Sequence, residues 1–180
     1  MSRFPWQKSS PGRENHELHR EWGKDSIFHG FITVINYPKK FWKVDPALIP
    51  AATPGDDESR VITGGPLIHL DALQVLLKSG DFDTDQLWLA TKRCEESLLK
   101  ESWTVEDVLY MLVSLKGDED YYKSEWCEVI GGRVVPCDVY RIPFDAMRKC
   151  RHPKGLRVYL KFSLEDDDSL TITLVSCHEG

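Results

Sequence analysis

The stretch Tyr121–Ile142 reads YYKSEWCEVIGGRVVPCDVYRI, and it decides the fold of this chain. Two runs rich in β-branched and aromatic residues flank the pair Gly131-Gly132. Glycine tolerates the positive φ angles of tight turns, so two such runs joined by two glycines are typical of an antiparallel hairpin. The stretch therefore predicts one strand over Tyr121–Ile130 and a second over Arg133–Ile142.

The sequence downstream keeps the same period of two. Leu156–Ser163 and Ser169–Cys177 predict two more strands, joined by a turn of three aspartates at residues 166–168. The link from Pro143 to Gly155 is long for a hairpin and rich in charge. Four consecutive strands of this kind are expected to form an antiparallel meander.

Side-chain alternation assigns the two faces of the strand at Leu156–Ser163. The apolar side, which must face the core, carries Val158, Leu160 and Phe162. The other side carries Arg157, Tyr159 and Lys161. Two cations flanking a phenol suit phosphate contact and base stacking, although tyrosine is also common at strand surfaces for packing reasons alone.

Three helices are expected before the meander. The first covers residues 67–79 and stops at Gly80, a residue type favoured after helix C-termini. The second runs over roughly Thr84–Lys100. The third starts at Thr104, whose hydroxyl can cap the amide of Asp107, and ends at Gly117. Helices followed by an antiparallel meander define an α+β fold class.

The first part of the chain has a different character. Residues 1–65 predict an N-terminal extension with one strand at Ile27–Tyr37 and a linker rich in proline and glycine at residues 44–66. Residues 66–180 then form the main domain. The first 25 residues contain no apolar region of a secretory signal, and no apolar run is long enough to span a bilayer.

Composition excludes several classes of protein. The chain has 180 residues, and five cysteines without a C-x-x-C pair favour free thiols in a reducing compartment over a disulfide framework or a four-cysteine zinc site. A cytoplasmic protein without a membrane partner is therefore expected. The net charge of −6 excludes a uniformly basic nucleic-acid binder, but it does not exclude a local basic patch.

Positive charge is concentrated in the predicted strands. Between Tyr121 and Phe162 there are nine basic and four acidic residues, so this segment has a local charge of +5 and the remainder of −11. A cation-rich sheet on an acidic body fits a phosphate-binding face. Solvated strand faces and charged loops often carry such a run as well, and charge alone weighs the two interpretations about equally.

Four short motifs in order resemble the MqsR toxins, the motility quorum-sensing regulator family of type II toxin–antitoxin ribonucleases. Leu98–Ser124 is similar to the helix and Asp-x-Tyr-Lys-Ser motif of the family, and Asp138–Arg141 to its Asp-Val-Tyr-Arg motif. Val158–Lys161 is similar to its Val-Tyr-Leu-Lys strand, and Val175–Glu179 to its Val-Ser-Phe-Lys-Glu end. The resemblance covers about residues 66–180.

The resemblance implies a RelE-like fold, with helices packed on a small antiparallel sheet. It implies a metal-independent messenger RNA endonuclease without a cofactor, which cleaves the phosphodiester through the 2′-hydroxyl near a GCU-like site. Its partners would be messenger RNA and a cognate antitoxin protein.

The resemblance also assigns the catalytic residues one by one. The motif lysine of the family falls on Lys123, the motif arginine on Arg141, the strand tyrosine on Tyr159 and the near-terminal lysine on His178. We expect Lys123 and Arg141 to stabilise the pentavalent phosphorane and Tyr159 to orient the phosphate or act as a weak acid–base. His178 would be the acid or the base, since imidazole titrates near neutral pH. The residues expected to bind RNA are Tyr122, Arg157, Lys161, Arg148 and Lys149.

Three features depart from the family pattern. A family glutamine falls on Cys137, which cannot repeat the two-way hydrogen bonding of an amide. The acidic overall balance and the N-terminal extension are the other two. The alternative hypothesis is therefore a non-catalytic relative with the same fold that binds RNA or protein.

Overall fold

The computed structural model describes residues 36–53, 56–166 and 169–180. The predicted strand at Ile27–Tyr37 lies outside the described residues except for Asn36 and Tyr37, which have irregular backbone. In the described part of the chain, no helix is both long and apolar enough to cross a membrane.

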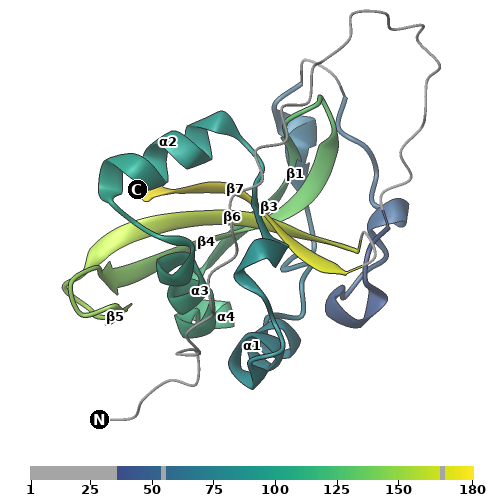
Figure 1. Cartoon of the computed structure of the whole chain (residues 1–180). Helices are drawn as coiled ribbons and strands as arrows, with labels where there is room; N and C mark the ends of the chain where they lie inside the picture. The colour runs from purple at the N-terminus through teal and green to yellow at the C-terminus, as the bar shows by residue number, and fades with distance from the viewer. Residues whose placement is uncertain (1–35, 54–55, 167–168) are drawn as a thin grey trace, which may run out of the picture. The chain divides into compact units, whose positions relative to one another are not determined.

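The predicted meander is confirmed and forms the centre of the fold (Figure 1). Its strands are β3 (Tyr121–Glu128), β4 (Val134–Asp145), β6 (Leu156–Asp166) and β7 (Leu170–Glu179). Each pairs antiparallel with the next. Gly131 and Gly132 between β3 and β4 have φ angles of 88° and 74°, which only glycine adopts without strain.

Three short strands enlarge the sheet to the order β1-β3-β4-β6-β7-β2, with β5 paired to β4. β1 (Val61–Ile62) is antiparallel to β3, and β5 (Cys150–Arg151) is antiparallel to β4. β2 (Leu87–Leu89) runs parallel to β7, which makes the sheet mixed. The α+β class is therefore confirmed, with four helices and seven strands among the described residues.

The prediction of a single helix over Thr84–Lys100 is wrong in its first part. A 3₁₀ turn, η4 (Thr84–Gln86), leads into β2, and the helix α2 begins only at Lys92 and ends at Glu101. Thr91 starts α2, because its hydroxyl accepts a hydrogen bond from the Cys94 amide at 3.0 Å. The preceding leucines instead pair with the exposed edge of β7.

The other two helices are confirmed, with changes at two boundaries. α1 (Leu70–Ser79) begins three residues later than predicted and ends at Gly80, which has a φ angle of 86°. α3 (Val105–Ser114) starts at Thr104 with the predicted cap, and Asp107 bonds back to the Thr104 amide. Gly117 does not end α3 as predicted. It begins the short helix α4 (Gly117–Asp120), because Leu115 has already left the helical conformation.

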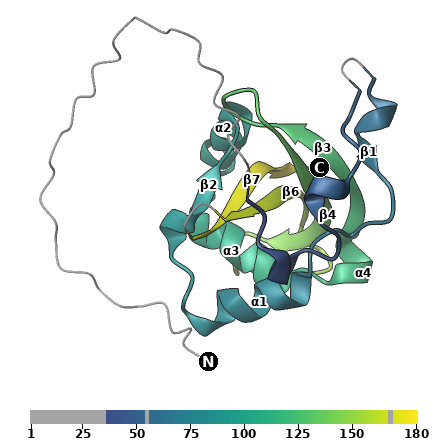
Figure 2. The same cartoon turned by 90° about the vertical axis from the view of Figure 1, so that its right-hand side faces the viewer.

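The main core lies between the helices and one face of the sheet (Figures 1 and 2). From the strands it receives side chains that are fully buried: Tyr140, Ile142, Phe144, Val158, Leu160, Phe162 and Leu164. This face includes the Val158, Leu160 and Phe162 set that the sequence assigned to the core, and the opposite parity is therefore available to functional side chains.

The segment assigned to the extension and linker also contributes to the sheet. Besides β1, it forms three 3₁₀ turns, which are η1 (Lys39–Phe41), η2 (Pro46–Leu48) and η3 (Glu58–Arg60). A backbone bridge joins Trp42 to Ile68. Asp138 of β4 anchors the end of the segment, because its carboxylate accepts hydrogen bonds from the amides of Leu67 and Ile68 at 2.9–3.0 Å.

Candidate functional site

The register of three strands brings three of the four predicted catalytic residues side by side. Arg141 of β4 is the direct partner of Tyr159 on β6, and Tyr159 is the direct partner of His178 on β7. The Tyr159 and His178 rings are stacked, with centroids 5.1 Å apart and an interplanar angle of 18°. These side chains therefore form a continuous line across the sheet face that points away from the helices.

A bulge in β3 adds Tyr122 to the same line. The pairing of β3 with β4 shifts by one residue between Tyr121 and Lys123. The guanidinium carbon of Arg141 lies 3.4 Å from the centre of the Tyr122 ring and 6.0 Å from that of Tyr159. Tyr122, Arg141, Tyr159 and His178 will be called the aromatic row. The guanidinium group of Arg141 lies over both tyrosine rings of this row, and these contacts restrict its orientation.

An ionic cluster lies on the same face, two residues further along the strands. Lys123 on β3 and Lys161 on β6 are both partners of Val139 on the intervening strand. Their ammonium groups both contact the carboxylate of Glu125, and Lys123 Nζ is 2.5 Å from Glu125 Oε2. Lys123, Glu125 and Lys161 will be called the ionic cluster. Only 9% of the Glu125 side chain is exposed.

The two lysines determine the charge state of Glu125. Burial alone would raise the pKa of this carboxyl group, but the hydrogen bonds and positive charges of Lys123 and Lys161 outweigh it and lower the pKa. Burial would likewise lower the pKa of Lys161, yet the electrostatic effects of Cys127 and Glu125 together raise it. Glu125 and Lys161 therefore carry opposite charges at neutral pH.

The aromatic row and the ionic cluster are in contact. Lys161 Nζ lies 5.7 Å from the centre of the Tyr159 ring, and Lys123 Nζ lies 5.9 Å from the centre of the Tyr122 ring. Burial raises the pKa of Tyr159, and the nearby Glu125 charge raises it further against the effect of the two lysines. Tyr159 is therefore a neutral phenol at neutral pH, able to donate one hydrogen bond.

The orientation of the His178 ring follows from its backbone contact. His178 Nδ1 lies 2.7 Å from the carbonyl oxygen of Glu179, so Nδ1 carries a proton and donates to that oxygen. Nε2 is then the ring nitrogen that carries the acceptor lone pair. The residue lies near the end of the chain, but β7 includes it and pairs it with β6.

In the motifs at residues 120–124 and 138–141, alternate side chains point to opposite faces of the sheet, so each motif has residues toward the core and residues toward the site. The residues toward the core form a hydrogen-bond chain in which Tyr121 OH lies 2.9 Å from Ser124 Oγ, and Ser124 donates to Asp138 at 2.6 Å. The outward residues of the same motifs are Lys123 and Arg141. These hydrogen bonds therefore fix both strands on the core side, while Lys123 and Arg141 both lie over the Tyr122 ring on the other side.

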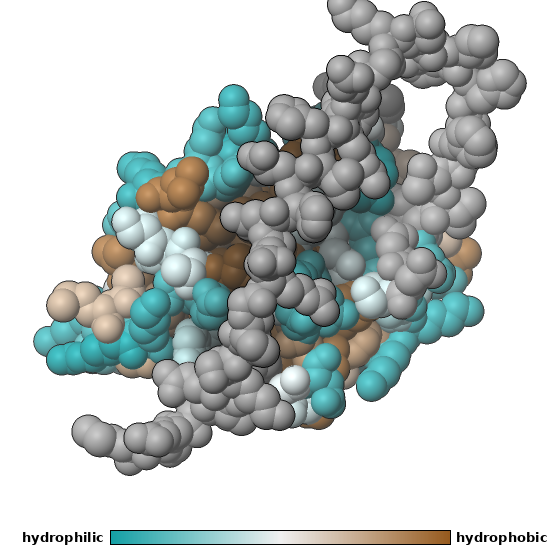
Figure 3. All heavy atoms as spheres, in the orientation of Figure 1, coloured by the Kyte–Doolittle hydropathy of each residue, from teal (hydrophilic) through white to brown (hydrophobic). Residues whose placement is uncertain are grey.

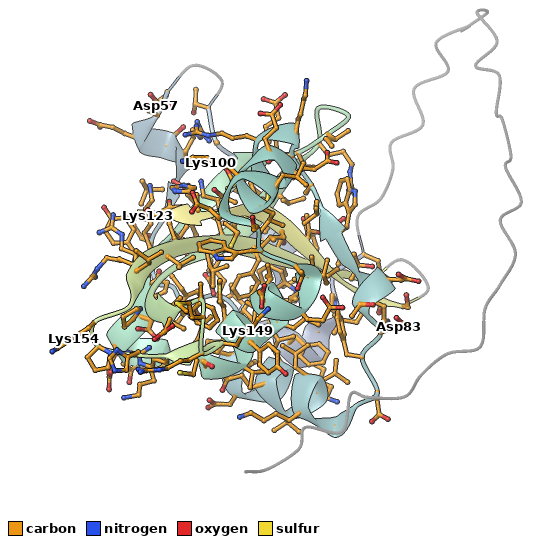
Figure 4. The ribbon with its side chains drawn as sticks, turned by 60° about the vertical axis from the view of Figure 1, so that its left-hand side comes forward. Asp57, Asp83, Lys100, Lys123, Lys149 and Lys154 are labelled. Carbon is orange, nitrogen blue, oxygen red and sulfur yellow. The ribbon has the colours of Figure 1, made fainter. Side chains whose placement is uncertain are left out.

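The predicted RNA-binding residues do not all share one surface. Tyr122 and Lys161 belong to the site, and Arg157 is exposed two residues before Tyr159 on the same face. Arg148 pairs with Asp145 in the turn after β4, and Lys149 reaches Asp107 of α3 on the helix side. Figure 4 shows Lys123 and Lys149 well apart, and Figure 3 shows hydrophilic and hydrophobic residues side by side at the β4–β5 tip.

Cys137, which replaces the family glutamine, is fully buried. It is the direct partner of Glu125 and lies on the same sheet face, beneath the ionic cluster. Burial raises its pKa well above the ordinary thiol value, so it stays protonated. A neutral buried thiol here can neither bind substrate nor act as a nucleophile.

Sequence reasoning missed Glu125, the residue that holds the two lysines together. The spacing of Lys123 and Glu125 did contain the signal, because residues two apart on a strand share a face. Among the described residues, no group of three or more His, Cys, Asp and Glu side chains could hold a metal ion.

Comparisons of the chain with protein-family models, with curated proteins and with solved structures each find no match.

Proposed function

We propose that this protein is an MqsR-like toxin with a RelE-like fold, a metal-independent endoribonuclease that cleaves messenger RNA through the 2′-hydroxyl. The observation that carries the proposal is the single sheet face that holds Lys123, Arg141, Tyr159 and His178 within contact of one another or of shared neighbours. Such an enzyme would act in the cytoplasm and would be blocked by a cognate antitoxin protein.

The cations on this face suit the transition state of RNA cleavage. Attack of the 2′-oxygen on phosphorus places additional negative charge on the non-bridging oxygens, and fixed cations stabilise that charge. Arg141 contacts the rings of both Tyr122 and Tyr159, and Lys123 and Lys161 each lie over one of these two rings. Tyr122 has 48% of its surface exposed, so the exposed part of its ring can contact a base.

The alternative is a non-catalytic relative that binds RNA or protein with the same face. It is favoured by the pairing of both lysines with Glu125 and by the buried thiol at position 137. Each lysine already has an anionic partner, which reduces the positive charge available to a phosphate. Expression in a bacterial host separates the two, since growth arrest that Lys123→Ala reverses supports the enzyme.

The decisive experiment incubates the purified full chain with a defined transcript in EDTA, followed by mapping of the product ends. Cuts that leave a 2′,3′-cyclic phosphate are expected from wild type. Lys123→Ala and His178→Ala should each lower the cleavage rate by roughly 10²- to 10³-fold, the usual effect of removing one group that stabilises the transition state.

Lys154→Ala is the matched control, because Lys154 is exposed in the turn before β6, away from the site. It should cleave at the wild-type rate. Absence of any cleavage by folded wild-type protein would reject the nuclease, and full activity in both site variants would reject the assignment of the residues.

A further inference from the structure

The site holds cations, a phenol, an imidazole and one carboxylate. Cleavage through the 2′-hydroxyl needs a group that accepts the proton of that hydroxyl. Charged lysine and arginine side chains have no acceptor atom, and the Tyr159 phenol is neutral. The acceptors that remain are the Glu125 carboxylate, which contacts both lysines, and the His178 imidazole.

We propose that Glu125 is the general base of the reaction and that His178 is the acid that protonates the leaving group. This inference rests on the proposed nuclease function and assigns two roles within the same site. Glu125 contacts both lysines, and Lys161 and Tyr159 separate it from His178. A phosphate that contacts Lys161 and Tyr159 would therefore have the carboxylate on one side and the imidazole on the other.

The surroundings of Glu125 allow it to accept a proton. Each carboxylate oxygen contacts one ammonium group, and an ionised carboxyl group has about four acceptor positions, so positions remain for a hydroxyl. The ionic contacts fix the carboxylate and keep it charged. The titratable and charged groups that face it from the packed strands are Lys123, Cys127, Cys137, Tyr159 and Lys161.

The proposed step balances without a metal or a cofactor. The proton of the 2′-hydroxyl moves to Glu125, and the 2′-oxygen forms a bond to phosphorus. The bond between phosphorus and the 5′-oxygen breaks, and Nε2 of the protonated His178 gives its proton to the 5′-oxygen. The products are a 2′,3′-cyclic phosphate and a 5′-hydroxyl, and water returns both groups to their starting charge.

Glu125→Gln tests the base directly, since the amide oxygen can still accept a hydrogen bond from one lysine but the amide cannot take up a proton. We expect kcat to fall on the order of 10²- to 10⁴-fold, the usual contribution of general acid–base catalysis. Binding of a 2′-deoxy oligonucleotide, which cannot be cleaved, should stay the same or become tighter. Glu128→Gln is the matched control on the same strand, because Glu128 is exposed, and it should keep wild-type kinetics.

A nucleoside 3′-(4-nitrophenyl phosphate) separates the base from the acid. Its leaving group departs without being protonated, so His178→Ala should cleave it within a few-fold of the wild-type rate. Glu125→Gln should remain as slow on this compound as on RNA, because the 2′-hydroxyl still has to be deprotonated.

The outcomes distinguish this inference from the proposed function. If wild type cleaves no RNA, the nuclease itself is rejected. If wild type cleaves and Glu125→Gln loses less than about ten-fold, or loses affinity for the 2′-deoxy oligonucleotide instead of kcat, then Glu125 only positions the lysines and the base assignment is overturned.

Discussion

Glu125 and Asp138 are both nearly buried carboxylates on adjacent strands, yet their pKa values move in opposite directions. Burial raises the pKa of Asp138, and three neutral donors, the Ser124 hydroxyl and the amides of Leu67 and Ile68, only reduce the rise. Around Glu125 the donors are two ammonium groups, whose charge reverses the effect of burial. The chemical class of the donors therefore decides the direction in which the pKa of each buried carboxyl group moves.

Because the pKa of Glu125 is lowered, the free energy of unfolding should depend on pH, and this dependence can be measured without an activity assay. A carboxyl group with a depressed pKa stabilises the native state above its ordinary pKa of 4.5, and the stabilisation is lost as the pH falls through the native value. We predict that the difference in free energy of unfolding between wild type and Glu125→Gln is constant near neutral pH. It should shrink as the pH falls below about 4.5.

Urea unfolding at a series of pH values from neutral to acidic measures this difference. Glu128→Gln should show no such change, since Glu128 is exposed at the end of β3. A difference that stays the same or grows toward acidic pH would show that the lysines do not hold Glu125 in its charged form.

At the scale of elements, the connection from β4 to β6 depends on Gly155. A Cβ atom at Gly155 would lie 2.4–2.8 Å from the backbone of Phe144, so β6 can begin beside β4 only without a side chain there. We predict that Gly155→Ala lowers the free energy of unfolding by about 1–3 kcal/mol, the usual cost of overpacking. The loss should be accompanied by faster amide exchange at Leu156 and Phe144, which are paired in the register.

Gly117→Ala is the matched control for this substitution. A Cβ atom there would meet Leu70 at 4.0 Å, which is ordinary contact, and the residue lies at the start of α4. It should be neutral or slightly stabilising, because alanine reduces the freedom of the unfolded chain. Equal stability of the two variants would contradict the close approach at Gly155.

The sequence predicted the elements whose own residues determine them. The meander followed from the period of two and the Gly131-Gly132 turn, and α3 followed from the Thr104 cap. β2 could not be predicted, because three residues fit a helix and a strand equally well and only pairing with β7 decides between them.

The site could likewise be predicted only where it depends on residues of one strand. Parity placed Tyr159 and Lys161 on one face, but the contact of Glu125 with Lys161 depends on a register that crosses β4.

At the scale of the whole molecule, an acidic chain with a basic sheet face should bind nucleic acid only through the site. The net charge is −6, so the rest of the surface repels a polyanion. Within the site, the charges of Arg141, Lys123 and Lys161 are reduced by one through Glu125. The protein is therefore expected to contact few phosphates, and its affinity should depend weakly on salt compared with a basic nucleic-acid binder.

The small net charge of the site sets how steeply binding of a single-stranded 2′-deoxy oligonucleotide depends on salt. For a single-stranded nucleic acid, each phosphate that the protein neutralises contributes about −0.7 to the slope of log K against log salt. The net charge of about two in the site therefore predicts a wild-type slope near −1.4. Glu125→Gln removes one negative charge and should steepen the slope by about 0.7, whereas Arg141→Ala should reduce it by the same amount. Fluorescence anisotropy titrations between about 50 and 200 mM salt measure the slopes.

Lys149→Ala is the control, because the Lys149 ammonium group pairs with Asp107 on the helix side. A change in slope as large as that of Arg141→Ala would show that the binding surface does not lie at the aromatic row.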